Sequence, residues 1–87
     1  MKFNLDNYKG NYCMHCKTLE EAINFCKFLD DNGRTWQNGD SYNSKLFYYV
    51  NENNTVIYFN KGLYGNIETA KDVHKCNILE WADYMEE

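Results

Sequence analysis

The spacing of apolar residues predicts one main helix over residues 19–32. The apolar positions that recur at helical intervals are Leu19, Ala22, Ile23, Cys26 and Leu29. Such spacing is typical of a helix that buries one face. Thr18 and Glu21 match a capping box, in which the Thr18 hydroxyl accepts from the Glu21 amide and the Glu21 side chain returns to the Thr18 amide. Gly33 supplies the left-handed residue that ends the helix.

Other segments carry the alternation and composition of strands. Residues 11–17 alternate, with Tyr12, Met14 and Cys16 on the drier face. Residues 45–50 and 55–59 are aromatic and β-branched and flank turn-forming asparagines, which predicts a hairpin. The remaining expected elements are a turn at residues 60–62, a short strand after it, weak helical character over residues 67–72 and a final strand over residues 73–79.

This order of elements predicts an α+β fold in a single domain over residues 1–87. One main helix packs on an antiparallel sheet of four to five strands, in the order β-α-β-β-β. Trp36 lies in a short extended segment before the loop at residues 38–41, and we expect it to close one end of the core.

The expected hairpin is apolar on both faces, and one helix covers only one of them. The second face carries Tyr48 and Tyr58. Contiguous apolar surface usually marks an interaction site, so we expect this face to meet a protein partner or, as a homodimer, a second copy of the chain. The alternative is that residues 34–45 fold over it.

Charge and composition narrow the function classes. Asp and Glu number 13 against 9 Lys and Arg, which gives a net charge of -4, and Arg34 is the single arginine. Direct nucleic-acid binding is not expected, since it needs clustered cations. The longest uncharged apolar run, residues 46–50, is far shorter than the roughly 20 residues that cross a bilayer. With no export signal at residue 1, we expect a cytoplasmic protein with reduced thiols.

Cysteine and histidine side chains offer two candidate chemistries. The residues that could supply zinc ligands are Cys13, His15, Cys16, His74 and Cys76. A strand sends the thiols of Cys13 and Cys16 to opposite faces, which favours core packing over metal binding. Cys13 near His15 or His74, with Asp72 as the acid, is a candidate nucleophile, but nothing builds an oxyanion donor beside it. We expect no metal, no cofactor and no enzyme activity.

Acidic side chains gather on the helix and towards residue 87. Such residues either form a solvated surface or present a field to a basic groove on another protein. The expected partner-binding residues are Tyr48, Tyr58, Asp30, Asp31, Glu80, Asp83 and Glu86.

Three segments carry a family resemblance. They are Cys16-Lys17-Thr18 with the helix start Glu20-Glu21-Ala22, the turn Gly33-Arg34-Thr35-Trp36, and Ile78-Leu79-Glu80-Trp81-Ala82-Asp83-Tyr84-Met85. Together they resemble a group of small proteins from phages and prophages of low-GC Gram-positive bacteria, and the resemblance covers most of the chain. The stretch after the turn, at residues 41–45, is shorter here than in those proteins. The resemblance implies a phage accessory protein, and phage proteins of this size and charge include inhibitors of host defence such as anti-CRISPR proteins.

The leading prediction is a phage-encoded inhibitor that binds a host defence protein, for example a CRISPR effector, in the host cytoplasm. One alternative is a sponge that sequesters a nucleotide-derived immune signal, stacked on tyrosine and neutralised by Lys9, Lys17, Arg34 or Lys75. A further alternative is a structural or regulatory component of the phage.

Overall fold

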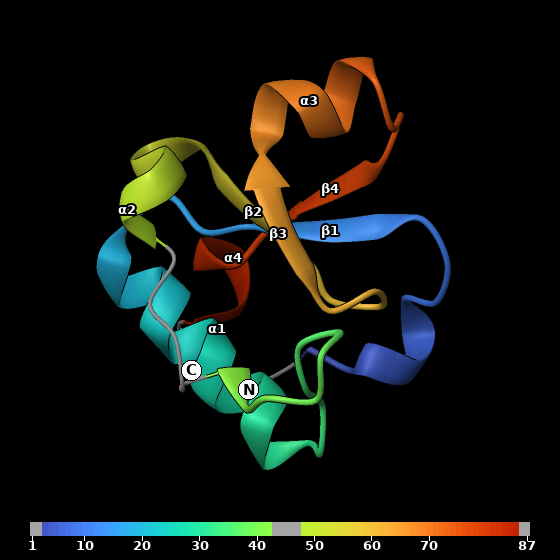
Figure 1. Cartoon of the computed structure of the whole chain (residues 1–87), viewed down its shortest axis with the longest axis vertical. Helices are drawn as coiled ribbons and strands as arrows, with labels where there is room; N and C mark the ends of the chain where they lie inside the picture. Colours follow the sequence, from blue (N-terminus) through green and yellow to red (C-terminus); the bar gives the residue numbers. More distant parts are fainter. Residues whose placement is uncertain (1–2, 43–47, 86–87) are drawn as a thin grey trace.

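Four short strands form a sheet at the centre of the fold, and helices cover both of its faces (Figure 1). The structure, a computed structural model, describes residues 3–42 and 48–85. The α+β class expected from the sequence is confirmed. No helix in these two ranges is long and apolar enough to cross a membrane. In chain order the elements are η1 (Leu5–Asn7), β1 (Tyr12–His15), α1 (Leu19–Asp31), α2 (Tyr48–Asn51), η3 (Glu52–Asn54), β2 (Thr55–Tyr58), β3 (Leu63–Asn66), α3 (Ile67–Asp72), β4 (Asn77–Glu80) and α4 (Ala82–Met85).

Helix α1 begins and ends close to the predicted residues. The Thr18 hydroxyl accepts a hydrogen bond from the Glu21 amide at 3.1 Å. The Glu21 carboxylate accepts from the Lys17 amide at 2.9 Å, one residue before the amide that the capping box predicts. Gly33 stands just beyond the helix at φ +75°, a backbone conformation that glycine adopts without strain. The residues that α1 buries are Ala22, Phe25, Cys26 and Leu29.

Strand β2 pairs with β3 and not with residues 48–50. The two strands are antiparallel, from Thr55↔Asn66 to Tyr58↔Leu63. Residues 48–50 belong to helix α2, so the predicted hairpin is wrong there, while residues 45–47 lie outside the described residues. Aromatic and β-branched residues favour a strand only where the segment can pair with a neighbouring strand. Here β3 occupies one side of β2 and β1 the other.

Strand β4 pairs with β1 in parallel, so the sheet is mixed and the antiparallel prediction is wrong. The register runs from Tyr12↔Asn77 to His15↔Glu80. The final strand also starts later than predicted, because residues 73–76 form a turn in which Lys75 has a φ of +53°. Strands β3 and β4 lie at opposite edges of the sheet. The chain must therefore cross a sheet face between them, as parallel connections do.

Helix α3 lies on this crossover and buries the second sheet face. Figure 1 shows α1 and α3 on opposite sides of the strands. The buried cluster on this face consists of Cys13, Val56 and Tyr58 from the sheet and Ala70 from α3. Tyr58 is only 7% exposed, so the expectation that it faces solvent or a partner is wrong. The cover is α3, for which the sequence gives only weak helical signals. From the loop expected there, Trp36 and Tyr42 belong instead to the core cluster on the other face, and residues 43–45 lie outside the described residues.

An aromatic core fills the space between the sheet and α1. The Phe3 ring packs against Phe25 and Trp81, with ring centroids 6.3 Å and 5.7 Å away. Trp81 is fully buried, and its indole N–H donates to the Asn24 carboxamide oxygen at 2.8 Å. Trp36 closes one end of the core as predicted, with its ring 4.2 Å from that of Tyr42.

Substitution of Gly39 and of Gly62 distinguishes the cost of backbone strain from the cost of a steric clash. Gly62 and Gly39 both have positive φ, +74° and +95°. A Cβ on Gly62 would lie 2.5 Å from the Gln37 backbone nitrogen, whereas one on Gly39 would meet nothing within 4 Å. We expect Gly39→Ala to lower the free energy of unfolding by about 1–2 kcal/mol, the left-handed strain alone, and Gly62→Ala to lower it by clearly more. Urea unfolding of both variants measures this, and equal losses would contradict the clash.

Candidate functional site

A buried histidine joins three segments at the end of β1. The Nδ1 of His15 lies 2.7 Å and 2.9 Å from the two carboxylate oxygens of Glu80, and its Nε2 lies 2.8 Å from the Asn53 carbonyl oxygen. A carbonyl only accepts, so Nε2 donates to Asn53. The Glu80 carboxylate is the partner of the other ring nitrogen, so neither nitrogen of the buried ring is left without a polar contact. The end of β4 and the η3 turn are thereby fixed to β1.

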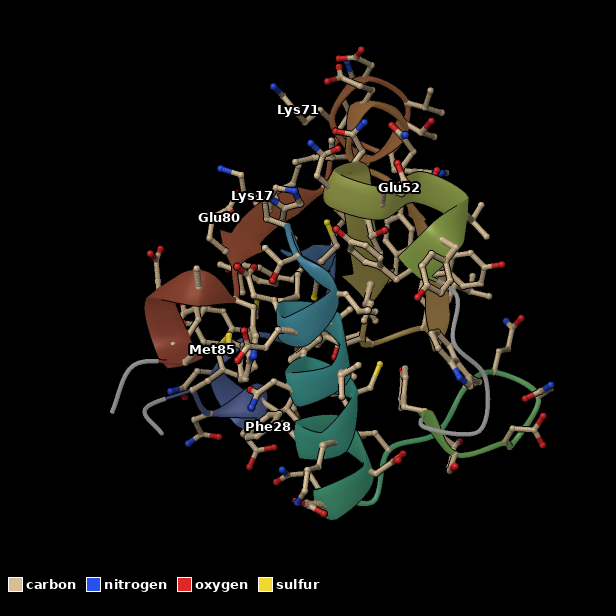
Figure 2. The ribbon with its side chains drawn as sticks, turned by 90° about the vertical axis from the view of Figure 1, so that its left-hand side faces the viewer. Lys17, Phe28, Glu52, Lys71, Glu80 and Met85 are labelled. Atoms are coloured by element: carbon tan, nitrogen blue, oxygen red, sulfur yellow. The ribbon has the colours of Figure 1, made fainter. Side chains whose placement is uncertain are left out.

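Tyr48 attaches α2 to the same end of the molecule. Its hydroxyl donates to the Lys17 carbonyl at 2.8 Å, while the Glu21 carboxylate takes the Lys17 amide. Desolvation, followed by the negative charges of Glu52 and Glu21, raises the pKa of the Tyr48 hydroxyl above its ordinary value of 10.0. Figure 2 shows Lys17, Glu52 and Glu80 along this end. The first turn of α1, α2, η3 and the end of β4 therefore meet where β1 leaves the sheet.

We call this region the strand-exit surface. Its side chains are Glu20, Glu21, Tyr48, Tyr49, Val50, Glu52 and Glu80. Tyr49 and Val50 are 66% and 65% exposed, which is high for residues of their size and apolar character. The surface thus combines the two exposed side chains of α2 with four carboxylates from the elements that meet here, and it also carries the Lys17 cation.

Part of the expected contact set lies on this surface. Tyr48 and Glu80 belong to it, and Asp83 is exposed in α4 three residues after Glu80. Asp30 and Asp31 do not, because they end α1, about 15 Å from its first turn at 1.5 Å per residue. Glu86 lies outside the described residues.

The two helix-end acids have local roles. Asp30 Oδ1 accepts from the Tyr42 amide at 2.6 Å and so holds the chain that returns from the loop. Asp31 forms an exposed ion pair with Lys27 at 3.1 Å. Neither contact places Asp30 or Asp31 in an acidic patch with Glu80.

The thiols of the Cys-x-x-Cys segment lie on opposite faces of the sheet. Cys16 belongs to the aromatic core and Cys13 to the cluster under α3. Burial, with a contribution from Cys76, raises the pKa of the Cys13 thiol to about 12, and burial with Asp30 raises that of Cys26 to about 12. Thiolate is the form that attacks and ligates, so these environments disfavour it. Among the described residues, no group of three His, Cys, Asp or Glu side chains is placed to hold a metal ion.

The histidines expected to assist Cys13 are held by other contacts. His15 binds Glu80 and Asn53, as described above. The His74 ring packs edge-on against the Tyr58 ring, with centroids 5.7 Å apart. Cys13 itself is fully buried, so a substrate has no access to its thiol in this conformation.

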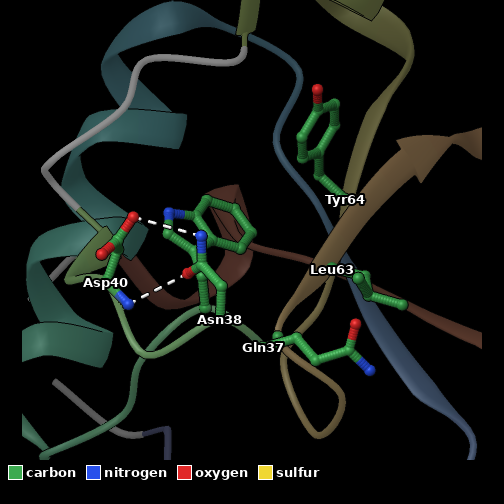
Figure 3. A pocket seen from close by; sticks show the side chains of 7 residues that line it. Gln37, Asn38, Asp40, Leu63 and Tyr64 are labelled. Carbon is green, nitrogen blue, oxygen red and sulfur yellow. Dashed lines mark hydrogen bonds between the residues drawn. The ribbon is translucent and has the colours of Figure 1, made fainter.

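A small pocket lies between the loop after α1 and strand β3 (Figure 3). This Trp36 pocket has a volume of about 200 Å³. The residues around it include Trp36, Asn38, Asp40, Gly62, Leu63 and Tyr64. The described lining residues contain the Asp40 carboxylate and none of the cations that the nucleotide-sponge alternative requires, namely Lys9, Lys17, Arg34 and Lys75. The pocket is therefore electrostatically unsuited to a phosphate group.

Sequence reasoning missed Tyr49, Val50 and Asp40 as surface features. In a strand, Tyr49 and Val50 would point to opposite faces, and only their helical backbone exposes both. Asp40 stands in a segment that turn residues mark as a loop. Nothing in the local sequence indicates that β3 lies beside it.

Comparisons with models of protein families, with curated proteins and with solved structures found no match to this chain.

The His15–Glu80 pair should contribute more to stability than the exposed Lys27–Asp31 pair. Glu80→Ala leaves the buried His15 Nδ1 without its acceptor, so we expect a loss of about 1–3 kcal/mol in the free energy of unfolding. Asp31→Ala removes a solvent-exposed pair and should cost about 0.5 kcal/mol or less. Urea unfolding at pH 6 compares the two, and similar losses would argue against the buried pair as a structural junction.

Thiol labelling should separate Cys76 from the other three cysteines. Cys76 is half-buried, whereas Cys13, Cys16 and Cys26 are buried. For a thiol with a pKa near 12, the thiolate fraction at pH 8 is about a thousandfold lower than for an ordinary thiol. We expect one thiol of the native protein to react with an aromatic disulfide reagent at pH 8, and all four after unfolding in urea. Two or more fast thiols in the native protein would contradict the burial pattern.

Proposed function

We propose that this chain is a phage-encoded accessory protein that inhibits a bacterial defence system by binding one of its proteins in the host cytoplasm. No bond is made or broken in this role. The phage origin is supported by the resemblance of the helix start, the turn before Trp36 and the segment from Ile78 to Met85 to small phage proteins. The binding role is supported by the strand-exit surface.

The observation that carries the proposal is the exposure of Tyr49 and Val50 on a surface that also carries several carboxylates. Aromatic and aliphatic side chains that stand out from a surface supply the anchors of protein interfaces. Carboxylates around such anchors attract a basic partner and raise the rate of encounter. A protein surface built for nucleic acid is basic because it neutralises phosphates, so it is a complementary partner for this region.

The proposed contact set differs from the one expected from the sequence. It keeps Tyr48, Glu80 and Asp83, and it gains Tyr49 and Val50. Asp30 and Asp31 lie at the far end of α1 and are left out, as is the buried Tyr58. Tyr48 and Glu80 also hold the surface in shape through Lys17 and His15, so substitutions there change both stability and binding.

Phage plaque assays against a panel of defined defence systems test the proposal directly. We expect the gene to restore plaques on at least one of them. With the defence protein so identified, Tyr49→Ser and Val50→Ser should each weaken binding about fivefold or more, as expected for interface anchors. Affinity should also fall as ionic strength rises, because the carboxylates are exposed.

Val73→Ser is the matched control for Val50→Ser. Val73 is 67% exposed but lies in the turn after α3, away from the strand-exit surface. Its substitution should leave plaque restoration and affinity unchanged. If the control weakens binding as much as Val50→Ser, or if no defence system is inhibited, the proposal is wrong. A rise in melting temperature with cyclic nucleotides in place of protein binding would instead favour the sponge alternative.

A further inference from the structure

The Trp36 pocket is built on a fixed backbone. The Trp36 amide donates to the Asp40 carbonyl at 2.8 Å, and the Gly39 amide donates to the Trp36 carbonyl at 2.8 Å, which closes a tight turn. The Gln37 amide donates to the Gly62 carbonyl at 2.9 Å and joins this turn to the β2–β3 connection. The walls are thus in place before any ligand arrives, which reduces the entropy lost on binding.

The size of the pocket limits its ligand to a single side chain or ring. Pockets that enclose a drug-sized molecule have volumes of roughly 300–1,000 Å³. The Trp36 pocket has about 200 Å³. One long side chain of a protein fits this volume, whereas a whole nucleotide would extend beyond it.

The chemistry of the walls selects a planar cation. The rings of Trp36 and Tyr64 stand 5.8 Å apart at 72°, so the pocket has aromatic surfaces in two orientations (Figure 3). Aromatic faces attract cations, and a guanidinium also stacks on them. Beside them, the Asn38 side-chain amide donates to Asp40 Oδ2 at 3.1 Å, and the Asp40 amide donates back to Asn38 Oδ1 at 3.0 Å. The Asp40 carboxylate is exposed and is oriented by the first of these bonds, while the second ties the Asp40 backbone to the Asn38 side chain.

We infer that the Trp36 pocket receives an arginine side chain of the partner protein. The guanidinium stacks against the aromatic wall and donates to the Asp40 carboxylate, while the aliphatic stem lies along Leu63. Arginine suits this site better than lysine, because its planar group stacks and offers several donors in fixed directions. The inference rests on the proposed function for its partner, since a surface that binds nucleic acid is rich in arginine and lysine.

A short peptide tests the pocket without any defence protein. The probes are acetyl-Gly-Arg-Gly-amide and the same peptide with citrulline, which keeps the shape of arginine but not the charge, or with lysine. The chain has two tryptophans, and Trp81 is fully buried, so its indole N–H signal in NMR spectra serves as an internal reference for Trp36. We expect the arginine peptide to shift the Trp36 signal in a saturable way and to leave the Trp81 signal in place. The citrulline and lysine peptides should bind several-fold more weakly.

Asp40→Asn should weaken arginine-peptide binding about fivefold, the upper range for an exposed ion pair. Asp72→Asn, at an exposed carboxylate in α3, is the matched control and should leave binding unchanged. An unchanged Trp81 signal shows that each variant is folded. Equal binding of the arginine and citrulline peptides, or no shift of the Trp36 signal at 10 mM peptide, would overturn the inference.

The two proposals fail separately. Arginine-peptide binding without inhibition of any defence system supports the pocket and contradicts the proposed function. Inhibition of a defence system that Asp40→Asn leaves intact supports the function and contradicts the pocket as part of its interface.

Discussion

Burial of both faces of β1 is the constraint on which the rest of the structure depends. Cys13 and Met14 are fully buried on opposite sides of this four-residue strand. A central strand of this kind needs a cover on each face, and a chain of 87 residues has few elements to supply them. Helix α1 with the aromatic core covers one face, and α3 covers the other. The elements that do not cover the sheet are short, namely α2, α4 and the loops. The proposed contacts lie on these elements.

His15 shows how a polar residue is accommodated in such a strand. Its ring nitrogens meet Glu80 and the Asn53 carbonyl, so the side chain is satisfied although it is only 9% exposed. The same bonds set the positions of η3 and of the end of β4. Helix α2 immediately precedes η3. The hydrogen bond from His15 to η3 therefore also helps to position the exposed Tyr49 and Val50 of α2. The candidate binding surface is therefore coupled to the core rather than carried on a free loop.

The elements that local sequence determines were predictable, and those that depend on distant segments were not. The α1 helix has its own cap, apolar stripe and terminal glycine, and β2 with the turn at residues 60–62 has its own strand and turn residues. The parallel pairing of β4 joins residues 65 positions apart, for example His15 and Glu80, and no periodicity encodes it. Residues 48–50 have strand-forming side chains, yet both neighbours of β2 are already taken. The Trp36 pocket could not be predicted from local sequence either, because its second wall comes from β3.

The pairing of β1 with β4 also determines which parts of the chain must come together for the fold to form. The Phe3 and Tyr84 rings lie 4.9 Å apart, and Tyr12 pairs with Asn77, 65 residues further along the chain. Without β4 and Trp81, β1 lacks one neighbour and the aromatic core lacks a fully buried indole ring. Contacts of such long sequence separation form late and slowly. We therefore expect the sheet to close in one late cooperative step, with no stable intermediate that lacks β4.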